Sequence, residues 1–318
     1  MSAFMEKINE KKNLFLGILL AASAVTAWGS QSVVCRYIYG NEPGTFDAAT
    51  LAFYRFFIGG IVLLIFQLFR KEERKKLFIV LKKGWYIFLV LGFIGITLEG
   101  FCQTLSLKYT TAGRSALFGA SAPVFTVIFA TLFLKEKLNK WNISGTLLGV
   151  AGVVLVLFKP GMDTFGSGSM ILGDILALCS GLSWGLYTVI AVKPTDEYGA
   201  ITCTAFSMIF ASVFLFIPAA WTGDIWQKMP ETTFWGTLYL GTVAAGFAIP
   251  AWVGATKYLP AGVLGAFGYL SLVLAILFSI LFLGEKFSWQ FAASFFMTLS
   301  SLYLVIKGSE KKDPDSGK

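Results

Sequence analysis

Long apolar stretches separated by short polar segments dominate this chain. Ten of them have the length of about 17 to 24 residues that an α-helix needs to cross about 30 Å of hydrocarbon. They lie at residues 14–34, 46–69, 85–106, 111–134, 142–158, 171–192, 200–220, 233–253, 261–283 and 288–306. None alternates apolar and polar positions over about ten residues, as the strands of a membrane β-barrel do. The pattern predicts an all-α membrane protein with ten transmembrane helices.

Two short blocks recur at one spacing along the chain. The block Lys108-Tyr-Thr-Thr-Ala-Gly113 returns as Lys257-Tyr-Leu-Pro-Ala-Gly262, and Leu132-Phe-Leu-Lys-Glu-Lys137 returns as Leu281-Phe-Leu-Gly-Glu-Lys286. A Trp-Gly pair also appears in the first span at Trp28 and in the sixth at Trp184. These echoes indicate a duplicated half-chain of five spans.

An odd number of spans in each half places the two copies in opposite orientations, which is the inverted-repeat architecture of many secondary transporters. We therefore expect an N-terminal segment at 1–13, a first repeat at 14–158, a linker at 159–170, a second repeat at 171–306 and a tail at 307–318. The N-terminal segment and the tail are polar, and we expect both to be mobile.

The composition excludes a sizeable soluble domain. The chain is 56% hydrophobic and 14% charged, whereas soluble domains have about 25% charged residues. Its net charge of +8 is unevenly distributed: loop 70–84 holds seven Lys or Arg residues, and its counterpart 221–232 holds only Lys228. The positive-inside rule then predicts a multi-pass protein of the cytoplasmic membrane with both termini in the cytoplasm. The basic loops are topology signals with a secondary role in binding anionic lipid, and we expect no nucleic-acid partner.

The two five-helix halves, the Trp-Gly pair in each and the apolar-Glu-Lys sequence that closes the fourth and ninth spans resemble the drug/metabolite transporter superfamily, specifically its ten-helix EamA-type members. The resemblance implies ten helices around a central substrate cavity, alternating access, and export of amino acids or other small metabolites across the cytoplasmic membrane. A fold shared by members with different substrates does not identify the substrate.

Two charged residues lie deep in predicted spans. At 1.5 Å per residue, Arg55 in the second span and Glu99 in the third lie about 14 and 10 Å from the outer boundary. A charge at such depth costs a few kcal/mol unless it is paired or hydrated. Their repeat counterparts, near Ser207 and Ala248, are uncharged. This asymmetry favours a role in recognition.

The two residues have different candidate roles. Arg55 could bind an anionic group or pair with Glu99. Alternatively it stabilises the fold, which the resemblance implies because EamA-like proteins often carry an Arg in this part of the second helix. Glu99 is the only acid clearly inside a predicted span, and it could bind a substrate amine or a coupling proton. Gln103 lies one turn further on the same face, so the two side chains could line the cavity together.

Semi-polar side chains follow helical spacing in the first and sixth spans. The candidate cavity or substrate-contacting residues are Trp28 and Gln31 in the first span, Ser183, Trp184 and Tyr187 in the sixth, and Ser121 in the fourth. The alternative is helix packing through small and hydroxylated residues, or placement of Trp at the membrane interface.

Proline, glutamate and glycine residues in the spans have both functional and structural interpretations. Pro123 and Pro250 are candidate hinges because proline removes a backbone hydrogen bond, although transmembrane helices also tolerate proline. Glu136 and Glu285 lie at span ends, where an interfacial ion pair or a gating contact would suit them. The small residues Gly145, Gly149 and Gly152 predict close helix approach, within the protomer or in a dimer.

The chain lacks the residues of common catalytic sites. It has no His, no phosphate-binding loop followed by Lys, and no pair of its four Cys residues at metal or redox spacing. We expect no cofactor, no metal and no enzymatic activity. The sequence predicts a secondary transporter for a small-molecule substrate in the lipid bilayer, as a monomer or dimer. An uncoupled facilitator and a membrane-embedded lipid-handling protein are the alternatives.

Overall fold

The computed structural model describes residues 2–41, 47–110, 112–157, 168–222, 224–284 and 287–310, and within these ranges it is helical without β-strands. Nine of the described stretches are long and apolar enough to cross a membrane, and Lys140–Leu155 is a shorter apolar helix at the fifth predicted span. The prediction of an all-α membrane protein with ten transmembrane helices is confirmed.

Seven of the spans are single helices, and three are interrupted. The uninterrupted spans are α1 (Ser2–Asn41), α2 (Ala48–Phe69), α8 (Lys140–Leu157), α9 (Gly168–Ile190), α11 (Ala200–Thr222), α14 (Ala261–Leu283) and α15 (Trp289–Glu310). The third span comprises α4 (Trp85–Leu91), η1 (Gly92–Leu98) and α5 (Glu99–Tyr109), and the fourth comprises α6 (Ala112–Gly119) and α7 (Ala122–Phe133). The eighth comprises α12 (Glu231–Tyr239), η3 (Leu240–Phe247) and α13 (Ala248–Ala255).

Helices also occupy segments that the sequence predicted to be loops or mobile ends. The first helix begins at Ser2, so most of the expected N-terminal segment is helical, and α15 continues to Glu310 into the expected tail. Two further helices, α3 (Lys71–Lys83) and α10 (Val192–Tyr198), and the short 3₁₀ turn η2 (Asp224–Trp226) lie between spans. Lys and Glu are good helix formers, so polarity alone does not end a helix that an apolar span has already nucleated.

The chain forms two compact units that do not coincide with the two sequence repeats. The first unit comprises Met1–Phe101 with Ile190–Leu259, and the second comprises Cys102–Val189 with Pro260–Lys318. Each unit therefore takes helices from both predicted repeats. Within each unit, helices that are far apart in the sequence pack against one another.

Glycines in the first unit show that the two repeats make equivalent contacts. The spacing that relates the repeated blocks, from Lys108 to Lys257, also relates Gly92 to Gly241. A Cβ at Gly92 would lie 2.5 Å from the Ser207 carbonyl oxygen, and a Cβ at Gly241 would lie 3.2 Å from the Arg55 carbonyl oxygen. The third span thus packs on the seventh as the eighth packs on the second. Such an exchange of partners is what a pseudo-twofold relation between inverted halves produces.

A second pair of glycines repeats this exchange, one in each unit. The correspondence of Trp28 with Trp184 also relates Gly17 to Gly173. A Cβ at Gly17 would lie 2.7 Å from Leu259 Cγ, and a Cβ at Gly173 would lie 2.7 Å from Thr110 Cβ. Leu259 and Thr110 are themselves one repeat apart.

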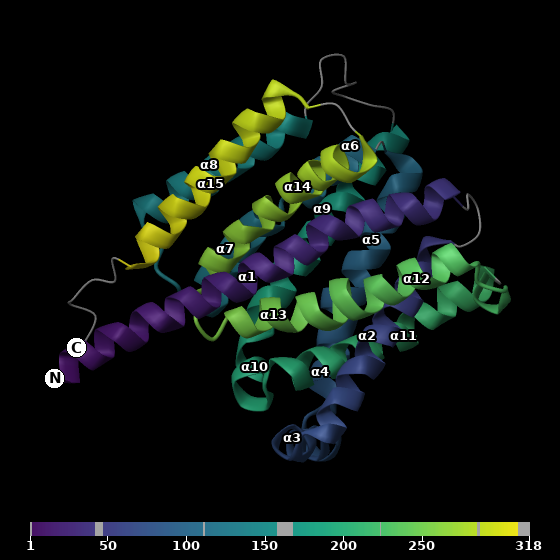
Figure 1. Ribbon diagram of the computed structural model, residues 1–318, viewed down its shortest axis with the longest axis horizontal. Coiled ribbons are helices and arrows are strands. Elements are labelled where there is room, and N and C mark those ends of the chain that lie inside the picture. Colours follow the sequence, from purple (N-terminus) through teal and green to yellow (C-terminus); the bar gives the residue numbers. More distant parts are fainter. Residues whose placement is uncertain are drawn as a thin grey trace. The chain divides into compact units, whose positions relative to one another are not determined.

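The helices α8 and α15 run side by side in the second unit (Figure 1). The predicted small residues of α8 face α15. A Cβ at Gly145 would lie 2.9 Å from the Ser301 carbonyl oxygen, and one at Gly152 would lie 3.2 Å from Met297 Cβ. Ser301 Oγ also donates to the Gly145 carbonyl at 2.6 Å. The close helix approach predicted for these glycines therefore occurs within the protomer.

The two repeated sequence blocks meet in the second unit. Glu136, from the second block of the first repeat, accepts hydrogen bonds from the amides of Ala261 at 2.7 Å and Gly262 at 3.0 Å, which belong to the first block of the second repeat. A carboxylate at a helix N-terminus satisfies amides that lack partners within the helix and is favoured by the helix dipole. Glu285, the repeat counterpart of Glu136, lies outside the described residues.

A buried ion pair connects the fourth span to the sixth. Arg114 forms an ion pair with Asp174, with Arg114 Nε 3.2 Å from Asp174 Oδ1, and Thr110 Oγ1 donates to the same oxygen at 3.0 Å. Arg114 and Asp174 are 5% and 6% exposed. Their repeat counterparts, Val263 and Ile18, are apolar. The charged pair is therefore a second departure from the repeat.

We expect Gly149→Ala to destabilise the second unit. The added methyl group would overlap the Tyr269 ring and lie 2.9 Å from Ser301 Oγ, and overpacking of this kind costs about 1 to 3 kcal/mol. The thermal unfolding midpoint of the detergent-solubilised protein measures the effect. Gly254→Ala is the matched control, since its methyl group would meet Ala200 Cβ at an ordinary 3.5 Å. Equal midpoints for the two variants would contradict this packing.

Removing one charge of the buried ion pair should destabilise the protein more than removing an exposed one. We expect Asp174→Asn to cost about 3 to 5 kcal/mol because it leaves Arg114 as a buried charge without its carboxylate. Glu72→Gln, which breaks the exposed Lys75–Glu72 pair, should cost less than about 1 kcal/mol. Thermal unfolding of both variants compares them, and an Asp174→Asn midpoint as high as that of Glu72→Gln would refute the structural role.

Candidate functional site

Two π-helical turns mark equivalent places in the third and eighth spans. The turn η1 ends immediately before Glu99, and η3 ends immediately before Ala248. These two end positions are one repeat apart. Turns of this kind occur frequently at functional sites because they disrupt the regular helical hydrogen bonds. The interruption is therefore a property of both repeats, whereas the charge of Glu99 belongs to one.

The second π-turn presents a backbone carbonyl to side chains from other helices. The amide of Ala248 donates to the carbonyls of Val243 and Ala245 and bypasses that of Ala244. The Ala244 carbonyl accepts a hydrogen bond from Trp28 Nε1 at 2.9 Å and a long one from Arg55 Nη2 at 3.5 Å. One carbonyl therefore orients both an indole and a guanidinium.

Aromatic rings surround this polar contact. The ring centroids of Trp28 and Trp252 lie 5.2 Å apart, and the Arg55 guanidinium lies 5.0 Å from the centroid of the Phe56 ring. Trp252 is fully buried and Trp28 is half-buried. The guanidinium and the indole thus share an environment of aromatic faces, which also suits a cationic or apolar group of a ligand.

Arg55 and Glu99 interact electrostatically but do not form a direct ion pair. The two residues lie within range of a mutual Coulombic interaction. Neither has an oppositely charged group within 4 Å among the described residues, and Arg55 Nε is buried without a hydrogen-bond partner there. Both side chains are half-buried. Their hydrogen-bonding capacity is largely unused by the described part of the protein.

Gln103 lies on the same helix as Glu99 but belongs to the other unit. Its Nε2 donates to Ser115 Oγ at 3.1 Å, and Ser115 Oγ also bonds Ser106 Oγ. A Cβ at Gly119 would lie 2.9 Å from Gln103 Oε1. The amide thus joins a cluster of hydroxyl groups where α5 meets α6. The joint lining predicted for Glu99 and Gln103 remains a prediction.

The fourth span is broken beside Ser121. Helix α6 ends at Gly119 and α7 begins at Ala122. Pro123 occupies the first turn of α7, where its missing amide leaves no helical bond unmade. Ser121 Oγ is buried without a partner among the described residues, and a Cβ at Gly181 would lie 2.5 Å from it. The break is therefore packed tightly against α9.

Most of the predicted stripe of the sixth span is buried. Ser183 is 1% and Tyr187 0% exposed, and the Trp184 ring lies 5.3 Å from that of Tyr187. In the first span, Gln31 is half-buried and makes no hydrogen bond with a described residue. Contact of these residues with substrate remains a prediction.

The two candidate hinges lie at different kinds of interruption. Pro250 is the third residue of α13, directly after the π-turn, and Pro123 follows the break of the fourth span. Proline is not the only cause of the π-turns, because η1 forms without one. A hinge role for either residue remains a prediction.

Sequence reasoning missed three features of these sites. Asp174 lies inside the predicted sixth span, so Glu99 is not the only acid inside a predicted span, and Arg114 in the fourth span is its buried partner. Trp252 lies in an apolar span with nothing in the sequence to distinguish it. A backbone carbonyl such as that of Ala244 has no signature in the sequence. The spacing from Gly92 to Gly241 was the available signal for the paired π-turns.

The described residues contain no group of three or more His, Cys, Asp or Glu side chains that could hold a metal ion. Cys35, Cys102, Cys179 and Cys203 form no disulfide in the structure.

Curated relatives resemble the chain over most of their length. An uncharacterized transporter of Archaeoglobus fulgidus is 29% identical over 81% of this chain and 88% of its own. The uncharacterized transporter YvbV of Bacillus subtilis is 28% identical over 90% of each chain. A WAT1-related protein of Arabidopsis thaliana is 27% identical over 90% of this chain and 88% of its own.

A solved crystal structure shares the fold, with a TM-score of 0.78 over 93% of this chain and 99% of that one at 19% identity. The model of the EamA-like transporter family matches the chain twice, at residues 15–158 and 171–307. The chain belongs to the EamA-like transporter family of the drug/metabolite transporter superfamily, and it is a multi-pass membrane transporter.

Proposed function

We propose that this transporter moves a small zwitterionic or amphipathic metabolite, such as an amino acid, outward across the cytoplasmic membrane by alternating access. The observation that carries the proposal is the state of Arg55 and Glu99. Two opposite charges lie inside spans, and neither is neutralised by a direct ion pair with a described residue. Ionisable residues inside a membrane are expensive and usually belong to a substrate or ion pathway.

The chemistry of the two side chains suggests the substrate class. A guanidinium binds a carboxylate through charge-assisted and often bidentate hydrogen bonds, and a carboxylate binds an ammonium group. Arg55 would bind the acidic group of the solute and Glu99 its amine, with Trp28 and Trp252 beside its apolar part. The repeat counterparts near Ser207 and at Ala248 are neutral, so the fold does not require a charge at these places.

The repeated contacts support alternating access. Inverted halves that exchange equivalent contacts can adopt two related states by exchanging their roles. The paired π-turns and the break before Pro123 are the interruptions at which the spans could bend. Glu99 is the candidate proton carrier if transport is coupled, and an uncoupled facilitator would have no such carrier.

Arg55→Gln should reduce transport strongly. We expect the flux of a labelled amino acid into proteoliposomes to fall at least about tenfold, mainly through a higher KM, because a charge-assisted hydrogen bond contributes about 1.5 to 3 kcal/mol. Arg55→Lys should retain part of the flux because it keeps the charge but loses the planar fork. Lys228→Gln, at an exposed cation outside the spans, is the control. Wild-type flux in Arg55→Gln would remove Arg55 from the binding site.

Glu99→Gln distinguishes a coupled transporter from a facilitator. An amide does not ionise, so this variant should lose the stimulation of transport by an imposed pH gradient while retaining exchange of internal for external substrate. Uptake with and without the gradient, at matched protein incorporation, measures the difference. Full gradient dependence in Glu99→Gln would show that Glu99 carries no coupling proton, and no gradient effect in the wild type would favour the facilitator.

A further inference from the structure

The segment after the second span is a short amphipathic helix outside the transport site. Helix α3 follows α2 with only Arg70 between them, so it begins where the span Ala49–Phe69 ends. Its buried residues Leu77 and Val80 hold one face against the first unit. Helix α3 is therefore attached through apolar side chains, while its residues Lys71, Arg74, Lys75 and Lys82 are exposed.

The exposed face of α3 combines cations with aromatic and aliphatic side chains. Lys71, Lys75, Phe78 and Lys82 are spaced four, three and four residues apart, so they lie along one face of the helix, and all four are exposed. Ile79 flanks them and is 52% exposed, while Phe78 is 56% exposed. A helix with basic and large apolar residues on its free surface is typical of one that lies in the membrane interface.

The charges of this segment are not balanced by its own carboxylates. From Arg70 to Lys83 the chain has seven Lys or Arg residues and two acidic residues. Both acids are already paired: Glu72 with Lys75 at 3.2 Å and Glu73 with Lys76 at 2.7 Å. Arg70 forms no ion pair with a described residue. The segment thus has a surplus of positive charge at the end of a span.

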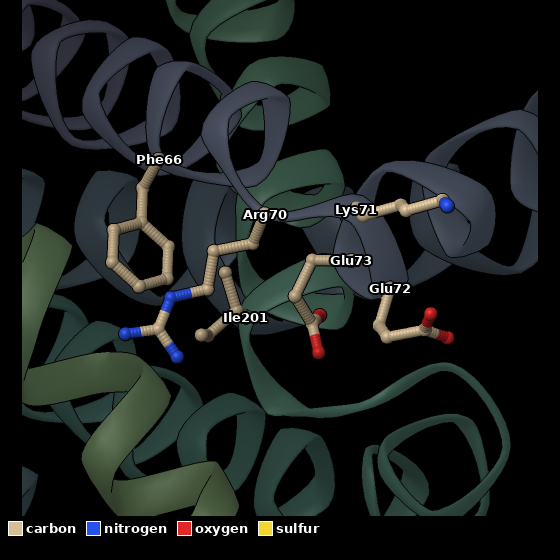
Figure 2. Close-up of a pocket in the computed structure, with 6 residues that line it drawn as sticks. All are labelled: Phe66, Arg70, Lys71, Glu72, Glu73 and Ile201. Carbon is tan, nitrogen blue, oxygen red and sulfur yellow. The ribbon is translucent and has the colours of Figure 1, made fainter.

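A cavity of about 370 Å³ lies where α2, α3 and the start of α11 meet. It is lined by Phe66, Arg70, Lys71, Glu72, Glu73 and Ile201 (Figure 2). The guanidinium of Arg70 extends beside the Phe66 ring, 4.9 Å from its centroid, and Ile201 lies between Arg70 and Glu73 (Figure 2). The cavity therefore offers an unpaired cation next to apolar walls.

The walls of this cavity are anchored. Gln67, in the last turn of α2, is fully buried, and its Nε2 donates to Thr202 Oγ1 at 2.6 Å. This bond joins the end of α2 to α11 beside Ile201. The arrangement holds Phe66 and Ile201 in place and leaves the long Arg70 side chain at the rim.

We propose that this cavity binds the phosphate of an anionic phospholipid in the leaflet next to α3, with Arg70 as its principal ligand. The lipid phosphate accepts hydrogen bonds from the guanidinium, and its acyl chains run past Phe66 and Phe69, which is 85% exposed. The exposed lysines of α3 attract anionic headgroups to the same surface. The lipid would hold α3 in the headgroup region and so fix the end of α2, the helix that carries Arg55.

Binding of defined lipids to the purified full-length protein tests this proposal. Native mass spectrometry of delipidated protein should show at least about threefold more bound phosphatidylglycerol than phosphatidylcholine with the same acyl chains. Arg70→Gln should reduce phosphatidylglycerol binding to the phosphatidylcholine level. Arg74→Gln, the matched control, removes an exposed cation of α3 that forms no ion pair with a described residue and does not line the cavity, and it should stay within about twofold of the wild type.

Three results would overturn the proposal. The wild type could bind both lipids equally, Arg74→Gln could lose as much binding as Arg70→Gln, or glycerol phosphate at equal concentration could displace the lipid and so show a site for free phosphate. If Arg70→Gln does not fold, Arg70→Lys takes its place, with intermediate retention expected because the charge remains and the planar fork is lost. The lipid comparison on the wild type is decisive in either case, and it is independent of any transport measurement.

Discussion

The absence of water from the bilayer interior constrains this whole structure, because polar groups there must find partners within the protein. Glu136 satisfies the first amides of α14, and Trp28 satisfies a carbonyl that the π-turn releases from its helix. Arg114 and Asp174 neutralise one another where both are almost fully buried. Arg55 and Glu99 stand apart because the described protein leaves their charges largely unpaired. The same constraint that explains the other contacts therefore singles out these two residues.

Equivalent contacts in the two repeats separate what the architecture needs from what is specific to this chain. The glycine contacts at Gly92 and Gly241 and the π-turns occur in both halves, so they belong to the fold. The charges of Arg55, Glu99, Arg114 and Asp174 each lack a charged counterpart in the other repeat. Of these, Arg114 and Asp174 pair with one another inside one unit, which is sufficient to explain their presence. The described contacts do not explain the charges of Arg55 and Glu99, and the recognition role is therefore proposed for these two residues.

The sequence predicted the spans well because hydrocarbon thickness sets a length that apolar runs must match. It also predicted the repeat, since two blocks and a Trp-Gly pair survive at matched positions. It predicted the small residues Gly145 and Gly152 as a packing face but left their partner open, and it gave no partner for Arg114. Each of these omissions concerns a partner remote along the chain. Spacing within one helix carries no information about which other helix lies opposite.

The sequence by itself determined the ten spans, the duplication and the identity of the charges inside the membrane. These follow from local composition, because each helix satisfies its own backbone and only its length and polarity decide whether it inserts. Tertiary structure decided which groups meet: that the two repeated blocks join through Glu136, that a π-turn offers the Ala244 carbonyl to Trp28 and Arg55, and that Arg70, between α2 and α3, lies beside a cavity without an ion pair to a described residue. Such contacts depend on how helices distant in the sequence pack, and packing is a property of the whole chain.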